Sequence, residues 1–201
     1  MPVAGKLRGK AEMMVGQLIV VLGPSGSGKD TLISFARREL SGEADVLFVR
    51  RAITRPADAG SEDHVAMMDS EFDAAIDEGQ FSLTWAANGL RYGLPRSIEA
   101  HLAEGKLAVV NGSRGAWAVI QQVFPSAVAV EVNVDPGILA RRLQSRGRES
   151  ATEIEARLAR ASALKSGFEA DVVIDNSGAV ETAGSALVEY LKLAMDTERS
   201  A

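Results

Sequence analysis

The chain has 201 residues, with 22 Lys and Arg against 27 Asp and Glu, so its formal net charge is −5, and it has no cysteine. Its length suits one domain, and a hydrophobic share of 46% is typical of a globular protein. The composition excludes disulfide frameworks, cysteine nucleophiles and cysteine-based zinc sites, and the acidic balance argues against non-specific binding to nucleic acid or a membrane surface.

The first part of the chain predicts two strands with a helix between them. Residues 1–14 are interpreted as a loose tail. Leu18–Leu22 is a continuous apolar run rich in β-branched residues, which is typical of a strand buried on both faces. A glycine-rich turn then leads to a helix predicted over 31–40, and a short second strand is predicted over 46–49.

The middle of the chain alternates less regularly. Residues 52–69 are polar and contain glycine and aspartate, so they are predicted to be mostly loop. Ser70 is expected to cap a helix over 70–78, and residues 81–85 are expected to form an edge strand.

The rest of the chain predicts an α/β domain, because strands and helices continue to alternate. Further strands are predicted at 107–110, 127–132 and 172–174, and further helices at 97–104, 116–123, 137–144, 152–165 and 181–193. This order favours a parallel sheet with helices on both faces. We expect residues 15–201 to form a single domain with insertions at about 52–95 and 145–152. No apolar run approaches the roughly 20 residues that span a bilayer, so a cytoplasmic protein is expected.

The turn after the first strand carries the clearest chemical motif. Gly23-Pro24-Ser25-Gly26-Ser27-Gly28-Lys29 fits the pattern G-x-x-x-x-G-K, between a buried strand and a helix. Glycines let backbone N–H groups reach phosphate oxygens, and the helix points its positive end at the same anion. We therefore predict a P-loop NTPase fold. The residues expected to bind the nucleotide phosphates are Gly23, Pro24, Ser25, Gly26, Ser27, Gly28, Lys29, Asp30 and Thr31.

Asp30 departs from the usual motif, which has Ser or Thr after the lysine to bind Mg²⁺. A carboxylate at this position would repel a triphosphate unless a cation lay between them. One interpretation is that Asp30 binds Mg²⁺ directly or through water. The other is that Asp30 is a first-turn acid favoured by the helix dipole.

Downstream motifs follow the order seen in a known family. After the second strand comes Arg51-Ala52-Ile53-Thr54-Arg55-Pro56, then Trp85–Pro95, then the arginine-rich segment 141–148. Together with the phosphate loop, this order resembles the guanylate kinase family over about residues 17–192. The resemblance implies ATP as the donor, an acceptor-binding insertion at about 52–95 and an arginine-rich lid at about 145–152.

Departures from that family concern the acceptor. Arg55 and Tyr92 match residues that bind the acceptor phosphate, but Asp58 stands where a second arginine is usual. The base-reading positions hold Thr84 and Leu94, so guanine is a poor candidate acceptor.

A relative within the family accounts for these departures. Gly-Lys-Asp in the loop, Ile-Thr-Arg-Pro-Ala, Ala-Asn-Gly-Leu-x-Tyr-Gly, Val-Val-Asn-Gly-Ser-Arg and Arg-Gly-Arg-Glu resemble the ribose 1,5-bisphosphate phosphokinases of bacterial phosphonate breakdown. This resemblance implies that ATP phosphorylates ribose 1,5-bisphosphate to 5-phosphoribosyl 1-diphosphate. A sugar bisphosphate has no base to read, in agreement with Thr84 and Leu94.

The resemblance also implies roles for individual residues. Lys29 is expected to hold the donor phosphates, with Mg²⁺ bridging them. Arg146 and Arg148 on the lid, and Arg157 in the helix that follows, are expected to neutralise the transferred group. The alternative is that these arginines lie on a solvent-exposed helix face. This alternative is weakest for Arg146 and Arg148.

Other residues of the candidate site keep two interpretations each. Arg114 is expected either to bind the second phosphate of the sugar or to start a helix at the surface. Arg51 is expected either to bind the acceptor phosphate, as Arg55 and Tyr92 do, or only to pair with Asp63 or Glu62. His64 either contacts phosphate or sugar or lies in an exposed loop. The segment 174–178 is a candidate adenine contact.

Two other functions stay open at this point. One is a nucleoside monophosphate kinase of altered base preference. The other is a non-catalytic binding module, which the presence of Lys29, Arg146 and Arg148 argues against. The expected partners are a sugar phosphate and ATP, without nucleic acid or membrane, and the oligomeric state stays open, with a homodimer among the alternatives.

Overall fold

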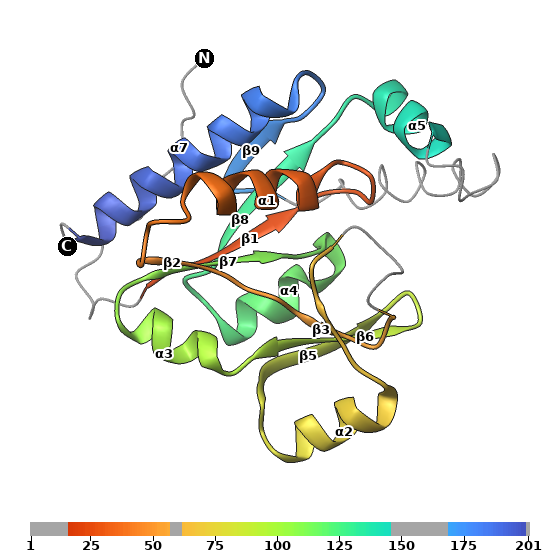
Figure 1. Ribbon diagram of the computed structural model, residues 1–201, viewed down its shortest axis with the longest axis vertical. Coiled ribbons are helices and arrows are strands. Elements are labelled where there is room, and N and C mark those ends of the chain that lie inside the picture. The colour runs from red at the N-terminus through yellow and green to blue at the C-terminus, as the bar shows by residue number, and fades with distance from the viewer. Residues whose placement is uncertain (1–15, 57–61, 146–168, 200–201) are drawn as a thin grey trace.

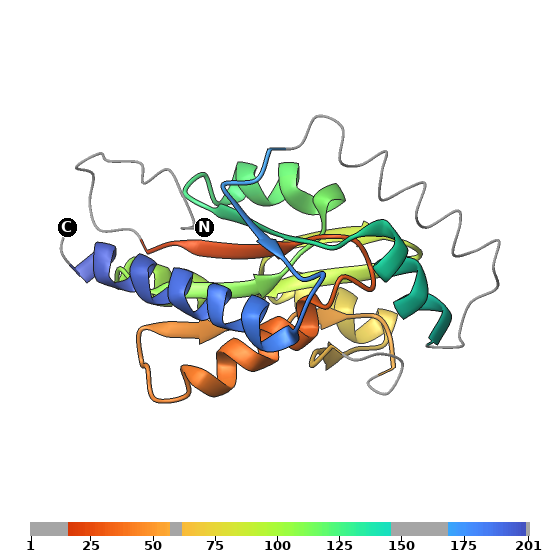
Figure 2. The same cartoon turned by 90° about the horizontal axis from the view of Figure 1, so that it is seen from above.

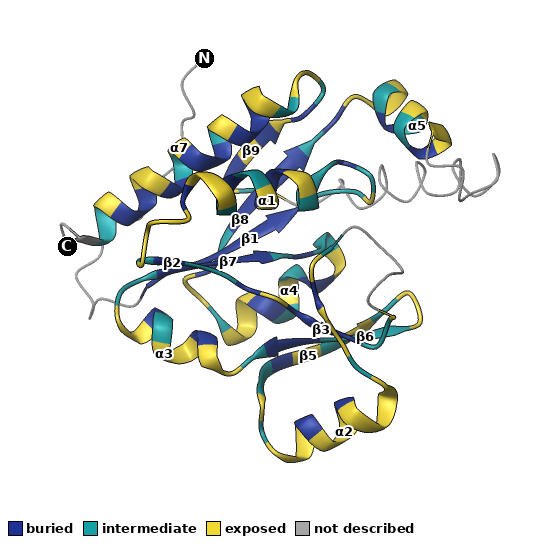
Figure 3. Ribbon diagram, in the orientation of Figure 1, coloured by how far each residue is buried: buried dark blue, intermediate teal, exposed yellow. Residues whose placement is uncertain are grey.

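The computed structural model describes residues 16–56, 62–145 and 169–199, and a five-stranded parallel sheet lies at its centre (Figure 1). The strand order is β2-β7-β1-β8-β9. Their bounds are β1 Leu18–Leu22, β2 Val46–Phe48, β7 Leu107–Asn111, β8 Val128–Asn133 and β9 Val172–Asp175. β1 is central and all five of its residues are buried, as expected for its unbroken apolar sequence (Figure 3).

Helices cover both faces of this sheet (Figure 2). Ile19 and Val21 of β1 pack in one core with α1 (Lys29–Glu39) and α7 (Val180–Arg199). Leu18, Val20 and Leu22 point to the other face and pack with α3 (Ser97–Ala103) and α4 (Arg114–Val123). The alternation of side chains along a strand therefore divides β1 between two cores. α5 (Pro136–Ser145) follows β8, and its Leu139 and Leu143 pack with Val134.

A second, four-stranded sheet lies beside the first, in the order β4-β3-β6-β5 (Figure 1). Its strands are β3 Ala52–Ile53, β4 Val65–Ala66, β5 Phe81–Ala87 and β6 Leu90–Pro95, and α2 (Asp69–Asp77) connects β4 to β5. β3 and β4 are parallel, whereas β6 runs antiparallel to β3 and β5. Leu83 and Leu94 of this sheet pack into the core that contains α3 and α4, so the second sheet is attached to the first through these helices.

The predicted alternation of strands and helices is confirmed in the described residues. The boundaries are shifted by one or two residues, except that α7 ends at Arg199 rather than at the predicted residue 193. The edge position of the strand at 81–85 is also confirmed. The prediction that 52–69 is mostly loop missed β3 and β4, which are too short to show a periodicity. β6 was also missed as a strand, because Gly93 and Pro95 are strand-breaking residues.

Ser70 as a helix cap is wrong. α2 begins at Asp69, and the Met68 backbone N–H donates to the Glu71 carboxylate at 2.7 Å. A side chain three residues into the helix thus caps it, as Glu often does at this position. Three predicted segments lie outside the described residues: the tail 1–14, the lid at about 145–152 except for residue 145, and the helix 152–165. The division into a single domain stays a prediction. Within the described part, no helix combines the length and apolar character that crossing a membrane requires.

Candidate active site

The loop between β1 and α1 bends around the side chain of Lys29. Its Nζ donates to the carbonyl oxygens of Gly23 and Pro24, each at 3.0 Å. Gly28 has φ 92°, and a Cβ added there would lie 2.4 Å from Asn176 Nδ2, so only glycine fits. Backbone N–H groups at the start of α1 and the Lys29 ammonium thus form the positive cradle that the motif predicts.

Asn176 fastens this loop to the end of the sheet. It is 1% exposed, its Nδ2 donates to the Ser27 carbonyl at 2.7 Å, and its backbone N–H donates to Asn133 at 2.8 Å. Sequence reasoning missed this role, although a polar residue directly after a strand was visible. The adenine contact predicted for 174–178 stays a prediction.

Charges from several elements converge on Lys29. Its pKa is lowered to about 8, mainly because burial removes water from the ammonium. Asp30 and Glu62 oppose this shift, whereas Arg51 and Arg114 add to it. Arg51, Glu62 and the start of α4 therefore lie close enough to the loop to act on Lys29, which brings the predicted donor and acceptor regions together.

This pKa predicts that ATP binding takes up a proton at high pH. A bound polyphosphate favours the charged ammonium, so uptake per site should rise from about 0.1 proton at pH 7 to about 0.9 at pH 9, and affinity should fall as pH rises through 8. Calorimetry in buffers of different ionisation enthalpy measures the uptake. Lys29→Met is the control and should show no rise between the two pH values; an equal rise in both proteins would contradict the assignment.

Asp30 is held by a residue from the neighbouring strand. Asn111, the last residue of β7, donates from Nδ2 to Asp30 Oδ1 at 2.6 Å. Asp30 lies in the first turn of α1, beside Lys29. The carboxylate is thereby oriented at the carboxyl edge of the parallel sheet, where ligands of such sheets bind.

Arg51 is buried in the predicted acceptor region and forms an ion pair with the partly buried Glu62. Arg51 is 6% exposed, and its Nε and Nη2 donate to the Glu62 carboxylate at 2.7–2.9 Å. Of the two partners considered from the sequence, Glu62 is therefore the observed one. Asp63 accepts instead from Arg37 at 2.8 Å and from Arg50 at 2.7 Å.

Arg55 follows shortly after β3, and Tyr92 lies on the adjacent strand β6, where it pairs with Ile53 of β3. Arg55 Nη2 is 4.0 Å from Glu62 Oε2, and its buried Nε has no acceptor among the described residues. A hollow of about 420 Å³ opens beside Arg55, lined by residues 54–56 and 66–71 except for Ser70. The Arg55 guanidinium can therefore still take an anionic ligand.

His64 is buried, so the exposed-loop interpretation is wrong. It is 4% exposed, with Nδ1 2.9 Å from the Glu62 carbonyl oxygen and Nε2 3.2 Å from the Arg55 carbonyl oxygen. The ring thus connects the backbone at Arg55 with the backbone at Glu62. The polar sequence around His64 gave no signal of this burial.

Arg114 begins α4 but is not a surface residue. Its side chain is 6% exposed and forms a hydrogen-bonded ion pair with Glu131 of β8, which is 7% exposed. The surface alternative is therefore wrong, while a role in substrate binding stays a prediction. Glu131 was missed, although an acidic residue inside an apolar strand was the available signal. Arg146, Arg148 and Arg157 lie outside the described residues.

The site fits a metal ion that arrives with a phosphate ligand rather than an ion held by protein alone. In the described ranges, no three His, Cys, Asp or Glu side chains gather as a metal cage. The oriented Asp30 carboxylate next to a phosphate cradle does fit Mg²⁺, which commonly binds one or two carboxylates together with substrate phosphates and water.

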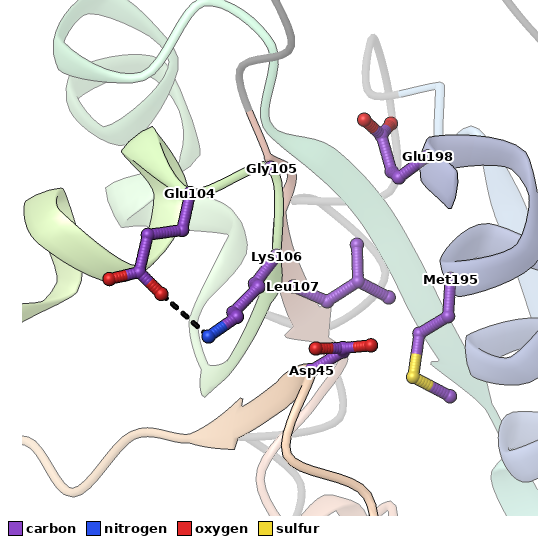
Figure 4. Close-up of a pocket in the computed structure, with 7 residues that line it drawn as sticks. All are labelled: Asp45, Glu104, Gly105, Lys106, Leu107, Met195 and Glu198. Carbon is purple, nitrogen blue, oxygen red and sulfur yellow. Dashed lines mark hydrogen bonds and ion pairs between the residues drawn. The ribbon is translucent and has the colours of Figure 1, made fainter. Parts of the chain in front are cut away.

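A smaller cavity of about 150 Å³ lies away from this site (Figure 4). Its lining residues are Asp45, Glu104, Gly105, Lys106, Leu107, Met195 and Glu198. They come from the amino ends of β2 and β7 and from the end of α7, whereas the phosphate loop follows the carboxyl end of β1. The cavity is therefore at the opposite edge of the sheet.

Comparison with known proteins adds to this geometry. The sequence profile of guanylate kinase matches residues 15–194. The ribose 1,5-bisphosphate phosphokinase PhnN of Desulfomicrobium baculatum is 46% identical over 173 residues, which cover 86% of this chain and 92% of that protein. PhnN of Agrobacterium fabrum is 43% identical over 175 residues, which cover 87% of this chain and 96% of that protein. Among solved structures, guanylate kinase from Anaplasma phagocytophilum matches with a TM-score of 0.67 at 20% identity, covering 90% of this chain and 87% of that one.

Proposed function

The chain belongs to the guanylate kinase family and, within it, to the ribose 1,5-bisphosphate phosphokinases, and on that premise we propose that it phosphorylates ribose 1,5-bisphosphate with ATP. An oxygen of the 1-phosphate forms a bond to the γ-phosphorus, and the bond from that phosphorus to the β–γ bridging oxygen breaks. The products are 5-phosphoribosyl 1-diphosphate and ADP.

One observation carries the proposal: a buried phosphate-loop lysine faces an acceptor region with a cation of its own. Glu62 lies near both Lys29 and Arg55, because its charge acts on the pKa of Lys29 and its carboxylate is 4.0 Å from the Arg55 guanidinium. Two phosphorylated molecules can thus meet between Lys29 and Arg55. Their approach needs charge neutralisation, which these two cations supply.

The acceptor chemistry requires positioning more than acid–base catalysis. A phosphate oxygen is already ionised at neutral pH, so no side chain has to remove a proton from it. We assign Arg55 and Tyr92 to the 1-phosphate and Arg114 to the second phosphate of the sugar. Lys29 holds the donor phosphates, and Arg146, Arg148 and Arg157 neutralise the transferred group.

Mg²⁺, when bound with ATP, would neutralise the donor phosphates, and Asp30 is the residue we assign to it. Asn111 orients the Asp30 carboxylate toward this task. Asp30→Asn should therefore raise the Mg²⁺ concentration for half-maximal rate by about tenfold, the usual effect of weakening a metal site. Titrating Mg²⁺ at saturating ATP measures this. An unchanged requirement would leave Asp30 with the helix-dipole role only.

The acceptor is tested by comparing substrates. ADP release is measured with ribose 1,5-bisphosphate, GMP, UMP and AMP, and ribose 1,5-bisphosphate should have the highest kcat/KM. Faster turnover of any nucleotide would support a nucleoside monophosphate kinase instead. No turnover of any acceptor would support a binding module.

The wider setting follows from the same assignment. We place the enzyme in the cytoplasm, where ATP is available, and in bacterial phosphonate breakdown as a source of 5-phosphoribosyl 1-diphosphate. The absence of cysteine supports a reducing compartment.

A further inference from the structure

We propose that Arg51 and Glu62 determine acceptor specificity by covering an aromatic surface on which a nucleobase would otherwise stack. The inference rests on the proposed function, since it concerns the acceptor region of that site. It assigns a role to an ion pair of a buried arginine that phosphoryl transfer itself does not use.

The aromatic surface is built by two neighbouring strands. Trp85 of β5 pairs directly with Tyr92 of β6, so both side chains emerge on one face of the second sheet. Their ring centroids are 5.3 Å apart, and the ring planes differ by 8°. The two rings are therefore stacked with a lateral offset, which leaves part of their faces for a further contact, and aromatic faces bind the bases of nucleotides by stacking.

Arg51 occupies this surface. Its guanidinium carbon lies 5.1 Å from the centre of the Tyr92 ring and 5.8 Å from that of Trp85. The planar, cationic group therefore takes the contact that a planar base would make. At 6% exposure, Arg51 leaves little of this contact accessible to a ligand.

Glu62 keeps Arg51 in place. Three N–H···O contacts of 2.7–2.9 Å join the two side chains, in the bidentate geometry that restricts both. A base that entered would have to break this pair. Breaking it would cost more than the stacking of one base returns, because the buried Arg51 guanidinium would lose its counterion.

The covered surface belongs to the acceptor region. Arg51 and Glu62 both act on the pKa of Lys29, and Glu62 is 4.0 Å from Arg55. Nearby, Leu94 is fully buried in the apolar core and offers no hydrogen bond to a base. A sugar bisphosphate needs no stacking surface, so covering the rings costs it nothing, whereas a nucleoside monophosphate loses its main apolar contact.

The test compares ligands that differ only in the base. Affinities for GMP and for ribose 5-phosphate are measured by calorimetry while a non-hydrolysable ATP analogue fills the donor site. The ratio of the two affinities should be near one in the wild type. In Arg51→Ala/Glu62→Gln, which uncovers the rings without leaving a buried charge, GMP should gain about tenfold over ribose 5-phosphate.

A matched variant separates covering from charge. Arg51→Met/Glu62→Gln also removes both charges but keeps a long side chain over the rings, so its ratio should stay near that of the wild type. Equal ratios in the two folded double variants would overturn the proposal. If the wild type does not turn over ribose 1,5-bisphosphate, the proposed function is contradicted. The ratio of the two affinities can still be interpreted in that case, because it is measured by binding alone.

A second measurement leaves Arg51 and Glu62 unchanged. The chain has two tryptophans, so Trp117→Phe leaves Trp85 as its only one. If Arg51 covers the rings, saturating GMP should change the Trp85 fluorescence by no more than ribose 5-phosphate does. Strong quenching by GMP alone would show a base against the ring and overturn the proposal.

Discussion

Lys29→Met is expected to lower kcat for phosphoryl transfer by about 10²–10³-fold, the effect of removing one preorganised group from a developing negative charge. Lys29 Nζ is held 3.0 Å from the Gly23 and Pro24 carbonyl oxygens, at the centre of the loop. Its ammonium therefore needs little rearrangement to reach a phosphate. The rate of ADP release at saturating ATP and ribose 1,5-bisphosphate measures the loss.

A lysine outside the site provides the control. Lys106 pairs with Glu104 at 2.5 Å at the opposite edge of the sheet, so Lys106→Met should retain wild-type kcat (Figure 4). Lys29→Met should also unfold at the wild-type urea concentration or above, because it removes a desolvated cation. A folded Lys29→Met enzyme with kcat within about threefold of the wild type would refute the donor-site assignment.

The parts of the fold that the sequence predicts well are those encoded by neighbouring residues. Leu18–Leu22 is apolar at every position, and the glycines and lysine that follow have fixed spacing, so strand, loop and helix could be placed without tertiary information. β3 has two residues and carries no such pattern, yet it aligns Ile53 with Tyr92 and so assembles the acceptor region.

The contacts that could not be predicted from the sequence join residues that are far apart in the chain. Asn176 donates to Ser27, 149 residues away, and nothing local in either segment indicates this contact. His64 has polar neighbours in sequence, yet it is buried, and its ring contacts the backbone carbonyl oxygens of Glu62 and Arg55. Such contacts satisfy buried polar groups, and their partners are set by the topology of the sheet rather than by sequence pattern.

Glu131→Ala is expected to lower the free energy of unfolding by about 3–5 kcal/mol, because it leaves the Arg114 guanidinium buried without its counterion. Both side chains are less than one-tenth exposed, Glu131 on β8 and Arg114 at the start of α4. Water cannot readily replace the missing carboxylate at such a position. Urea unfolding at equilibrium measures the change.

Replacing both partners should reverse the loss. Arg114→Met/Glu131→Leu has no buried charge at this position, so its stability should return to the wild-type value or exceed it by about 1–4 kcal/mol. A double variant as unstable as Glu131→Ala would show that the ion pair itself is required for folding. A loss below about 1 kcal/mol in the single variant would show that Arg114 finds another partner.

The same double variant separates the structural role of Arg114 from its assigned role toward substrate. If Arg114 binds the second phosphate, the stable double variant should have a KM for ribose 1,5-bisphosphate raised by about tenfold or more, since a charged hydrogen bond to phosphate is lost. The KM for ATP should stay unchanged. A stable double variant with both KM values unchanged would limit Arg114 to neutralising Glu131 inside the protein.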